Sequence, residues 1–165
     1  MQTFAINTLG CKVNQYEAQQ IIQFLTDCNW LYVQNFQSAE IIIIHTCCIT
    51  QTASAKSRQL IHKAEKLNPK AKIVVSGCLV SSDPKEFENI PKNTLFAHNI
   101  NELLELLVKE FKLTPKSLEN KGIKQFTGQT RAFLKVQDGC DGFCSYCIIP
   151  TTRPNLSYKP IEQVV

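Results

Sequence analysis

The chain has 165 residues, of which 44% are hydrophobic and 19% are charged, and its formal net charge is +4. This length fits one domain, or one domain with part of another, and is sufficient to bury a real core. The densest apolar run, residues 41–44, is too short to span a membrane, and the N-terminus lacks the features of a secretory signal. We therefore expect a cytoplasmic protein with no membrane partner. Its eight cysteines are then reduced thiols, more typical of metal binding or catalysis than of disulfides.

Strand-like and helix-like patterns alternate along residues 1–113. Strands are predicted at residues 2–9, 40–46, 71–76 and 95–97, with a short extended segment at 30–36. Helices are predicted at residues 15–28, 52–67, 83–89 and 99–111, the last opened by a capping box of Asn99 and Glu102. This alternation predicts an α/β fold with an open, mostly parallel sheet flanked by helices.

Residues 114–130 contain Pro115, Gly122, Gly128 and several lysines without a clear periodicity, which is typical of a linker. A new strand is predicted at residues 131–137. The chain therefore divides into a domain at 1–113, a linker at 114–130 and a second part at 131–165. Seven basic residues against two acidic ones between Lys109 and Lys135 indicate either a surface that attracts phosphates or a solvated linker.

Three cysteines each follow a predicted strand. Cys11, Cys47 and Cys78 come within a few residues of a strand's carboxyl end. In an open α/β sheet the ligand crevice lies outside those ends, so these three thiols are expected to converge. Three thiolates can hold an iron–sulfur cluster with one iron open to another ligand. Cysteine is also a common small buried residue, and placement alone leaves both interpretations open.

A second cysteine group is much denser. Cys140, Cys144 and Cys147 form a C-x3-C-x2-C pattern in a turn that contains Gly139 and Gly142. Three thiols so close together favour a metal ligand set, and the glycines allow the backbone to turn the sulfurs toward one point. A zinc site would normally need a fourth Cys or His at regular spacing, and none follows. An iron–sulfur cluster with one vacant iron site is therefore favoured over zinc.

These motifs resemble those of the radical S-adenosylmethionine (SAM) methylthiotransferases. The resemblance rests on residues 8–17 (TLGCKVNQYE), 45–47 (HTC), 76–78 (SGC), 135–140 (KVQDGC) and 147–150 (CIIP). It extends over essentially the whole chain, as an N-terminal domain plus the start of a radical SAM domain. The first segment is most similar to the branch that modifies N6-threonylcarbamoyladenosine at position 37 of transfer RNA.

The resemblance implies two [4Fe–4S] clusters and SAM as cofactors. Cys11, Cys47 and Cys78 would hold the auxiliary cluster, and Cys140, Cys144 and Cys147 would hold the cluster that binds SAM. SAM cleavage would give a 5′-deoxyadenosyl radical, which removes hydrogen from C2 of adenosine 37 so that a methylthio group can be attached. The implied partners are tRNA and an electron donor such as a flavodoxin or ferredoxin. Tyr146 would lie near the adenine of SAM or pack beside the loop.

Some residues fall outside the resemblance or depart from it. Cys28 lies on the apolar face of its predicted helix, which favours packing, whereas Cys48 could compete with Cys47 as a ligand. His45 could hydrogen-bond toward a cluster or simply be a satisfied residue at a strand end. Arg153 matches the family pattern, but Pro154 replaces a glycine and is stiffer.

Three alternatives remain at this stage. The enzyme could act on isopentenyladenosine or on a ribosomal protein, although the Lys12-Val13-Asn14 signature speaks against the latter. The chain could instead be a non-catalytic iron–sulfur or zinc-binding module. Since it stops where the radical SAM barrel begins, we expect the 165 residues by themselves to be inactive.

Overall fold

A five-stranded sheet forms the centre of the protein in the computed structural model, which describes residues 2–82, 87, 89–114, 123–126, 131 and 133–164. Its order is β2-β1-β3-β4-β5, and all neighbouring strands run parallel. The strands are β1 (Thr3–Thr8), β2 (Leu31–Tyr32), β3 (Ile41–Thr46), β4 (Lys72–Gly77) and β5 (Thr94–Ala97). The predicted α/β fold with a parallel sheet is therefore confirmed.

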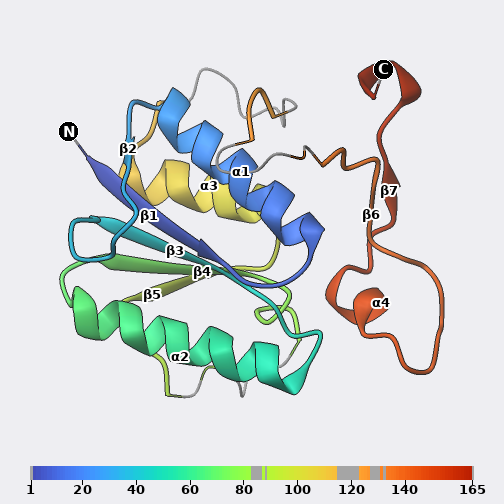
Figure 1. The fold of residues 1–165 in the computed structure, drawn as a ribbon, viewed down its shortest axis with the longest axis horizontal. Coiled ribbons are helices and arrows are strands. Elements are labelled where there is room, and N and C mark those ends of the chain that lie inside the picture. Colours follow the sequence, from blue (N-terminus) through green and yellow to red (C-terminus); the bar gives the residue numbers. More distant parts are fainter. Residues whose placement is uncertain are drawn as a thin grey trace.

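Helices cover both faces of this sheet. Helices α1 (Lys12–Asp27) and α3 (Ile100–Phe111) lie on one face, and α2 (Gln51–Leu67) lies on the other (Figure 1). Helix α1 begins three residues earlier than predicted, directly after Cys11. The helix predicted at 83–89 falls largely outside the described residues. No helix in the described ranges combines the length and apolar character that crossing a membrane requires.

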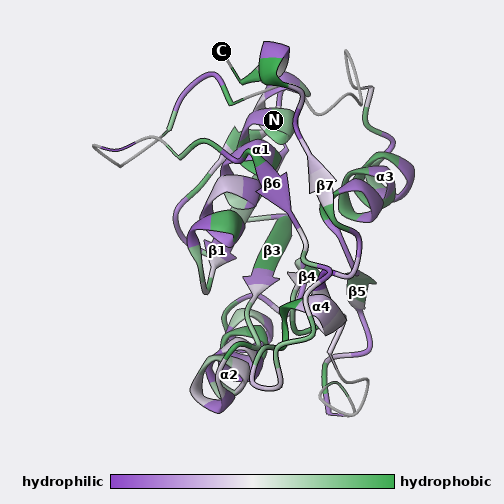
Figure 2. Ribbon diagram, turned by 90° about the vertical axis from the view of Figure 1, so that its right-hand side faces the viewer, coloured by the Kyte–Doolittle hydropathy of each residue, from purple (hydrophilic) through white to green (hydrophobic). Residues whose placement is uncertain are grey.

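The isoleucine run in β3 holds the two layers of the core together. Ile41 and Ile43 pack with Phe4, Ile21 and other residues on the side of α1 and α3. Ile42 and Ile44 join the second apolar cluster, on the side of α2. Successive side chains of a strand point to opposite faces, so an uninterrupted apolar run is what a doubly covered central strand requires. Figure 2 shows β3 as a hydrophobic strand between the helices.

The strand order creates a crevice at one end of the sheet. After β1 the chain crosses to β2 on one side and then returns to β3 on the other side of β1. At such a point the connections that leave neighbouring strands diverge, and the carboxyl ends of β1 and β3 are left uncovered. The segments that follow these two strands therefore face an open edge.

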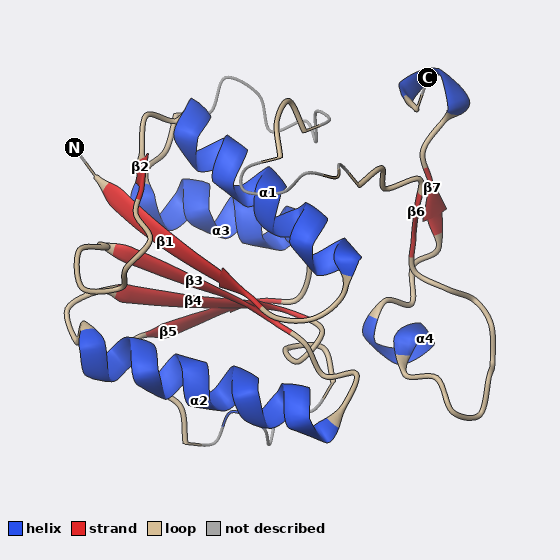
Figure 3. Cartoon of the chain, viewed as in Figure 1, coloured by secondary structure: helices blue, strands red, loops and turns tan. Residues whose placement is uncertain are grey.

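Residues 133–164 form a small appendage beside this edge, and the predicted linker at 114–130 lies largely outside the described residues. Strands β6 (Gln137–Asp138) and β7 (Ser157–Tyr158) pair antiparallel, and the chain that connects them contains the short helix α4 (Ile149–Thr152), which lies below the pair in Figure 3. The strand predicted at 131–137 is wrong for its described residues before Gln137. Among the described residues, β7 is the only strand that pairs with this segment, and Lys135 turns its side chain into a cluster of ion pairs.

Candidate functional site

The carboxyl ends of β1, β3 and β4 bring the first cysteine set to one edge of the sheet. Cys11 is the N-cap of α1, Cys47 follows β3, and Cys78 follows β4. The register pairs Thr46 with Gly77, so Cys47 and Cys78 are the next residues on adjacent strands. The expected placement of each cysteine just beyond a strand is therefore confirmed.

Asn14 connects this edge, and the sequence analysis did not identify it as a site residue. Its Nδ2 donates to the carbonyl oxygens of Leu9 and Thr46, each at 2.8 Å. Its Oδ1 accepts from the thiols of Cys11 at 3.8 Å and Cys78 at 4.0 Å. A fully buried asparagine thus holds the ends of β1 and β3 together and places an oxygen between two thiols. The signal for it was its position three residues after Cys11 in the motif.

Gly10 allows Cys47 to lie against the turn between β1 and α1. Its φ of +105° is in the region that favours glycine. A Cβ at this position would lie 2.8 Å from Cys47 Sγ, which is closer than a side chain tolerates. On the other side, Ser57 of α2 exchanges hydrogen bonds with the backbone of Cys47 at 3.2 and 3.3 Å. The position of Cys47 is therefore determined by neighbours on both sides.

The protonation of Cys78 is influenced by its surroundings. Burial raises the pKa of the Cys78 thiol, and the charge and hydrogen bond of Arg153 oppose that rise. Metal ligation requires the thiolate, so a nearby guanidinium helps this buried cysteine to act as a ligand. Within the described ranges, no three His, Cys, Asp or Glu side chains are already arranged as a metal site. The ligand set Cys11, Cys47 and Cys78 therefore stays a prediction.

The second cysteine set lies in an open loop. Gly139 has a φ of +76°, and a Cβ there would collide with the carbonyl of Asn155. The amide of Gly142 donates to Cys140 Sγ at 3.4 Å, and the amide of Cys147 donates to the carbonyl of Cys144 at 3.1 Å. Cys144 is exposed. Gly139 thus makes a turn that favours glycine, and Cys144 is accessible to a cofactor, whereas the convergence of the three sulfurs on one point stays a prediction.

Tyr146 projects from the same loop into solvent. Its side chain is 90% exposed, so its ring is free to stack on a ligand held at the loop. This exposure is not what a packing residue would show. Its predicted place near the adenine of SAM is not tested and stays a prediction.

The two remaining cysteines, Cys28 and Cys48, pack against apolar residues. Cys28 packs partly buried against the core beside α1, as expected. Cys48 lies in an apolar cluster with Cys78 and Leu79, and Ile148 from the second cysteine segment packs against it. Burial, followed by the neighbouring Cys78, raises the pKa of Cys48 to about 11. Cys47 Sγ instead lies against the turn at Gly10, and the choice of Cys47 over Cys48 as a ligand stays a prediction.

A buried ion cluster joins α1 to the segments that flank the second cysteine set. Glu17 Oε1 accepts from Lys135 Nζ and from Arg153 Nη1, each at 2.8 Å. Glu17 Oε2 accepts from Arg153 Nη2 at 2.8 Å and bonds His45 Nε2 at 3.0 Å. Asp138 accepts from Arg153 at 2.8 Å and from Lys135 at 2.7 Å. We call these five residues the Glu17 cluster.

Electrostatics keep Glu17 and Arg153 of this cluster ionised. Burial by itself would raise the pKa of the Glu17 carboxyl, but the hydrogen bonds from Arg153 and His45 outweigh it and hold that pKa below its ordinary value. Burial likewise works against the charge of Arg153, whereas Glu17 and Asp138 raise its pKa above the ordinary value. Sequence reasoning placed Lys135 in a basic stretch; in the structure its charge is directed inward, to Glu17 and Asp138.

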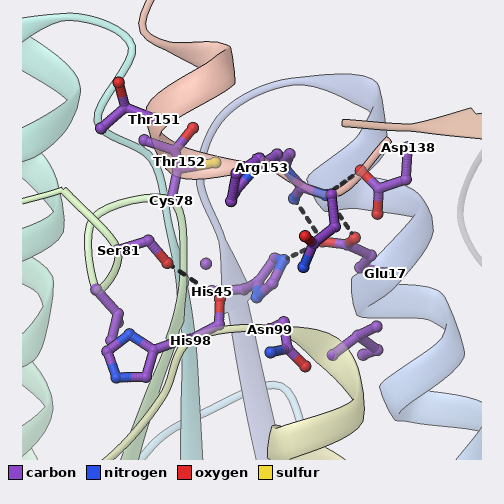
Figure 4. A pocket seen from close by; sticks show the side chains of 15 residues that line it. Glu17, His45, Cys78, Ser81, His98, Asn99, Asp138, Thr151, Thr152 and Arg153 are labelled. Atoms are coloured by element: carbon purple, nitrogen blue, oxygen red, sulfur yellow. Dashed lines mark hydrogen bonds and ion pairs between the residues drawn. The ribbon is translucent and has the colours of Figure 1, made fainter. Parts of the chain in front are cut away.

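A cavity of about 410 Å³ lies between the sheet edge and residues 151–155. Figure 4 shows Thr151–Arg153 at the top of the view, Cys78 and Ser81 at the left, and Glu17 and Asp138 at the right; His45 lies near the centre, and His98 and Asn99 lie below it. Its wall combines polar groups with a thiol of the first cysteine set. His45 Nδ1 is buried and has no hydrogen-bond partner among the described residues. The cavity therefore lies beside Cys78 and offers several polar groups on a wall that is largely apolar.

The fold and the two cysteine segments define an α/β thiol-bearing domain joined to a second cysteine-rich module. Residues 3–97 match the family described as "Uncharacterized protein family UPF0004", and the chain belongs to this family. Its resemblance to the methylthiotransferases is thereby confirmed.

Three relatives illustrate this likeness. The chain is 39% identical over 164 residues to the threonylcarbamoyladenosine tRNA methylthiotransferase MtaB of Chlamydia pneumoniae, covering 99% of this chain and 38% of that protein. It is 33% identical to the MtaB of Bacillus subtilis, covering 100% of this chain and 40% of that protein. It is 27% identical to the tRNA-2-methylthio-N(6)-dimethylallyladenosine synthase of Desulfotalea psychrophila, covering 99% and 41%. The chain thus spans about two fifths of the length of the curated relatives it matches.

Proposed function

We propose that this chain supplies both cysteine sets of a tRNA methylthiotransferase. The supporting observation is that the second set docks on the edge that carries the first. Ile148, which follows Cys147, packs against the apolar cluster of Cys48, Cys78 and Leu79. A reaction that needs two metal clusters and one substrate requires such proximity, because reacting groups must be held in place together.

The residues fit the two [4Fe–4S] clusters by their donor chemistry. Thiolate is the donor that iron–sulfur clusters prefer, and three thiolates leave one iron open in each cluster. Cys11, Cys47 and Cys78 would hold the auxiliary cluster, and Cys140, Cys144 and Cys147 would hold the cluster that binds SAM. Radical chemistry from SAM is what the loaded second site would supply. The chain's own residues would orient the thiols, through Gly10 and Asn14, and offer Tyr146 to the adenine of SAM.

The substrate we propose is N6-threonylcarbamoyladenosine at position 37 of tRNA, which would receive a methylthio group at C2. Two of the three relatives above are named for this nucleoside and one for dimethylallyladenosine. The cavity beside Cys78 has a largely apolar wall on which His45, Ser81 and Asn99 offer hydrogen-bonding groups, a combination that fits a nucleobase with a polar substituent. The proposal includes a cytoplasmic location and a flavodoxin or ferredoxin as electron donor.

Metal analysis of the anaerobically reconstituted chain tests the cofactor assignment. We expect two clusters, hence about eight irons and eight sulfides per chain. Replacing Cys140, Cys144 and Cys147 together by alanine should remove about half of the iron, whereas Cys28→Ala, the matched control, should remove none. Zinc in place of iron, or iron that is unaffected by the triple replacement, would favour a non-catalytic module.

The nucleosides of tRNA test the substrate. A chimera in which these 165 residues replace the matching part of the Bacillus subtilis relative, expressed in cells that lack methylthiolated tRNA, should give the methylthio derivative of threonylcarbamoyladenosine, detected by mass spectrometry. Methylthio-isopentenyladenosine in its place would reassign the substrate. A methylthiolated ribosomal protein with unmodified tRNA would reject the tRNA assignment.

A further inference from the structure

We propose that the Glu17 cluster is a positioning device that fixes the second cysteine segment against the sheet edge. This inference rests on the proposed function, since it concerns how the two cysteine sets are placed. Glu17 is contributed by α1, six residues after Cys11, and His45 by β3, two residues before Cys47. Lys135 and Asp138 precede Cys140, and Arg153 follows Cys147 by six residues. One carboxylate therefore holds both flanks of the C-x3-C-x2-C loop.

The geometry of Arg153 gives the attachment a defined orientation. Its Nη1 and Nη2 donate to the two oxygens of Glu17, both at 2.8 Å, as a bidentate pair. Its Nη2 also donates to Asn14 Oδ1 at 3.2 Å, the oxygen that accepts from the Cys11 and Cys78 thiols. A planar guanidinium held at two points cannot rotate as a lysine ammonium can. The second segment is thus oriented relative to the first cysteine set.

The bonding of Glu17 points to positioning and not to acid–base chemistry. Each of its oxygens already has two partners, so neither is free to take a proton from a substrate. The side chain is 4% exposed, whereas those of Lys135 and Arg153 are 13% and 15% exposed. Two carboxylates face two cations, so removing one partner leaves a charge buried without compensation.

Two further hydrogen bonds hold the second cysteine segment in the same position. The amide of Cys140 donates to the carbonyl of Arg153 at 3.3 Å, which closes the loop that contains the three cysteines. Lys159, beyond β7, donates to the hydroxyl of Tyr16 at 3.0 Å, so α1 holds the segment at a second place. Loss of the Glu17 cluster should therefore loosen the loop while leaving the sheet intact.

Amide hydrogen exchange of the full chain, followed by mass spectrometry, tests this proposal. We expect Glu17→Gln to speed exchange of peptides within residues 136–159 by roughly tenfold or more, and to speed exchange of the peptides of β3 and β4 much less. A purely stabilising role would instead speed exchange by the same factor in both regions. The matched control is Asp27→Asn, which removes the exposed ion pair of Asp27 with Lys124. It should alter neither region.

Arg153→Met provides a second variant that leaves the N-terminal domain unmodified. It should reproduce the loosening of residues 136–159 even if Glu17→Gln folds poorly. Unchanged exchange in that segment for Arg153→Met would overturn the proposal. Hydrogen exchange needs neither bound clusters nor activity, so it tests this inference separately from the proposed function. Faster exchange in the variants, in a chain that binds no iron, would reject the proposed function alone. Iron binding together with unchanged exchange would reject this inference alone.

Discussion

At the scale of single residues, the position of the thiols depends on uncharged residues that surround them. Gly10 is the clearest case, because it combines a positive φ with a close contact to Cys47. Asn14 acts similarly by joining two strand ends with one side-chain amide. Neither residue carries a charge or a thiol, yet both determine where thiols lie. Motif residues between the cysteines are therefore part of the site.

Gly10→Ala should destabilise the domain and weaken iron binding. An added Cβ would force Cys47 Sγ away and would strain a backbone at φ +105°, at a cost of about 1–3 kcal/mol. Urea unfolding measures the first effect, and iron content after reconstitution measures the second. Unchanged stability together with full iron content would show that Cys47 does not depend on this turn.

At the scale of elements, the sheet is built around β3. Its four isoleucines alternate between two apolar clusters and are fully buried. Helices α2 and α3 begin at defined caps, where Thr50 Oγ1 accepts from Ala53 at 3.1 Å and Asn99 Oδ1 accepts from Glu102 at 3.0 Å. Glu102 Oε2 accepts a hydrogen bond from the amide of His98, one residue before the cap. In the usual capping box it would accept from the amide of Asn99 itself, so the predicted box forms with the neighbouring amide. Local sequence and tertiary packing therefore agree.

Ile43→Ala should lower the free energy of unfolding by about 2–5 kcal/mol, since it opens a cavity in a core that cannot collapse around it. Leu67→Ala is the matched control: Leu67 ends α2 and is 38% exposed, so its replacement should cost much less. Chemical denaturation of both variants gives the comparison. Equal losses would contradict the central role of β3.

At the scale of the whole molecule, the Glu17 cluster connects two parts of the chain that are far apart in sequence. Arg153 lies 136 residues from Glu17, and Lys135 lies 118 residues from it. Breaking one partner of such a buried cluster is costly, although the intact cluster need not stabilise more than apolar residues would. The Glu17 cluster therefore acts mainly by fixing the position of residues 135–153 relative to α1 and β3.

The stability of the chain should therefore fall in acid. The pKa of Glu17 is lower in the folded state than its unfolded value of about 4.3, so the folded state binds fewer protons. Its contribution is complete above about pH 4.3 and is lost as the pH falls toward the folded-state pKa. Denaturation between pH 3 and 7 measures this slope, and Glu17→Gln should reduce it. An identical slope in the variant would show that other carboxyls cause the loss.

The sequence alone specifies the strands, the helices and the cysteine motifs, because each of them depends on residues that are close together in the chain. Alternating β-branched runs and helical periods predicted the parallel α/β sheet, and the position of Cys11, Cys47 and Cys78 after strands predicted their shared edge. The convergence of Glu17, His45, Lys135, Asp138 and Arg153 had no such local signal. Ion pairs between distant residues depend on which surfaces meet, and no pattern of neighbouring residues records that. Only the folded chain shows that Lys135 turns inward and that Arg153 binds beside the first cysteine set.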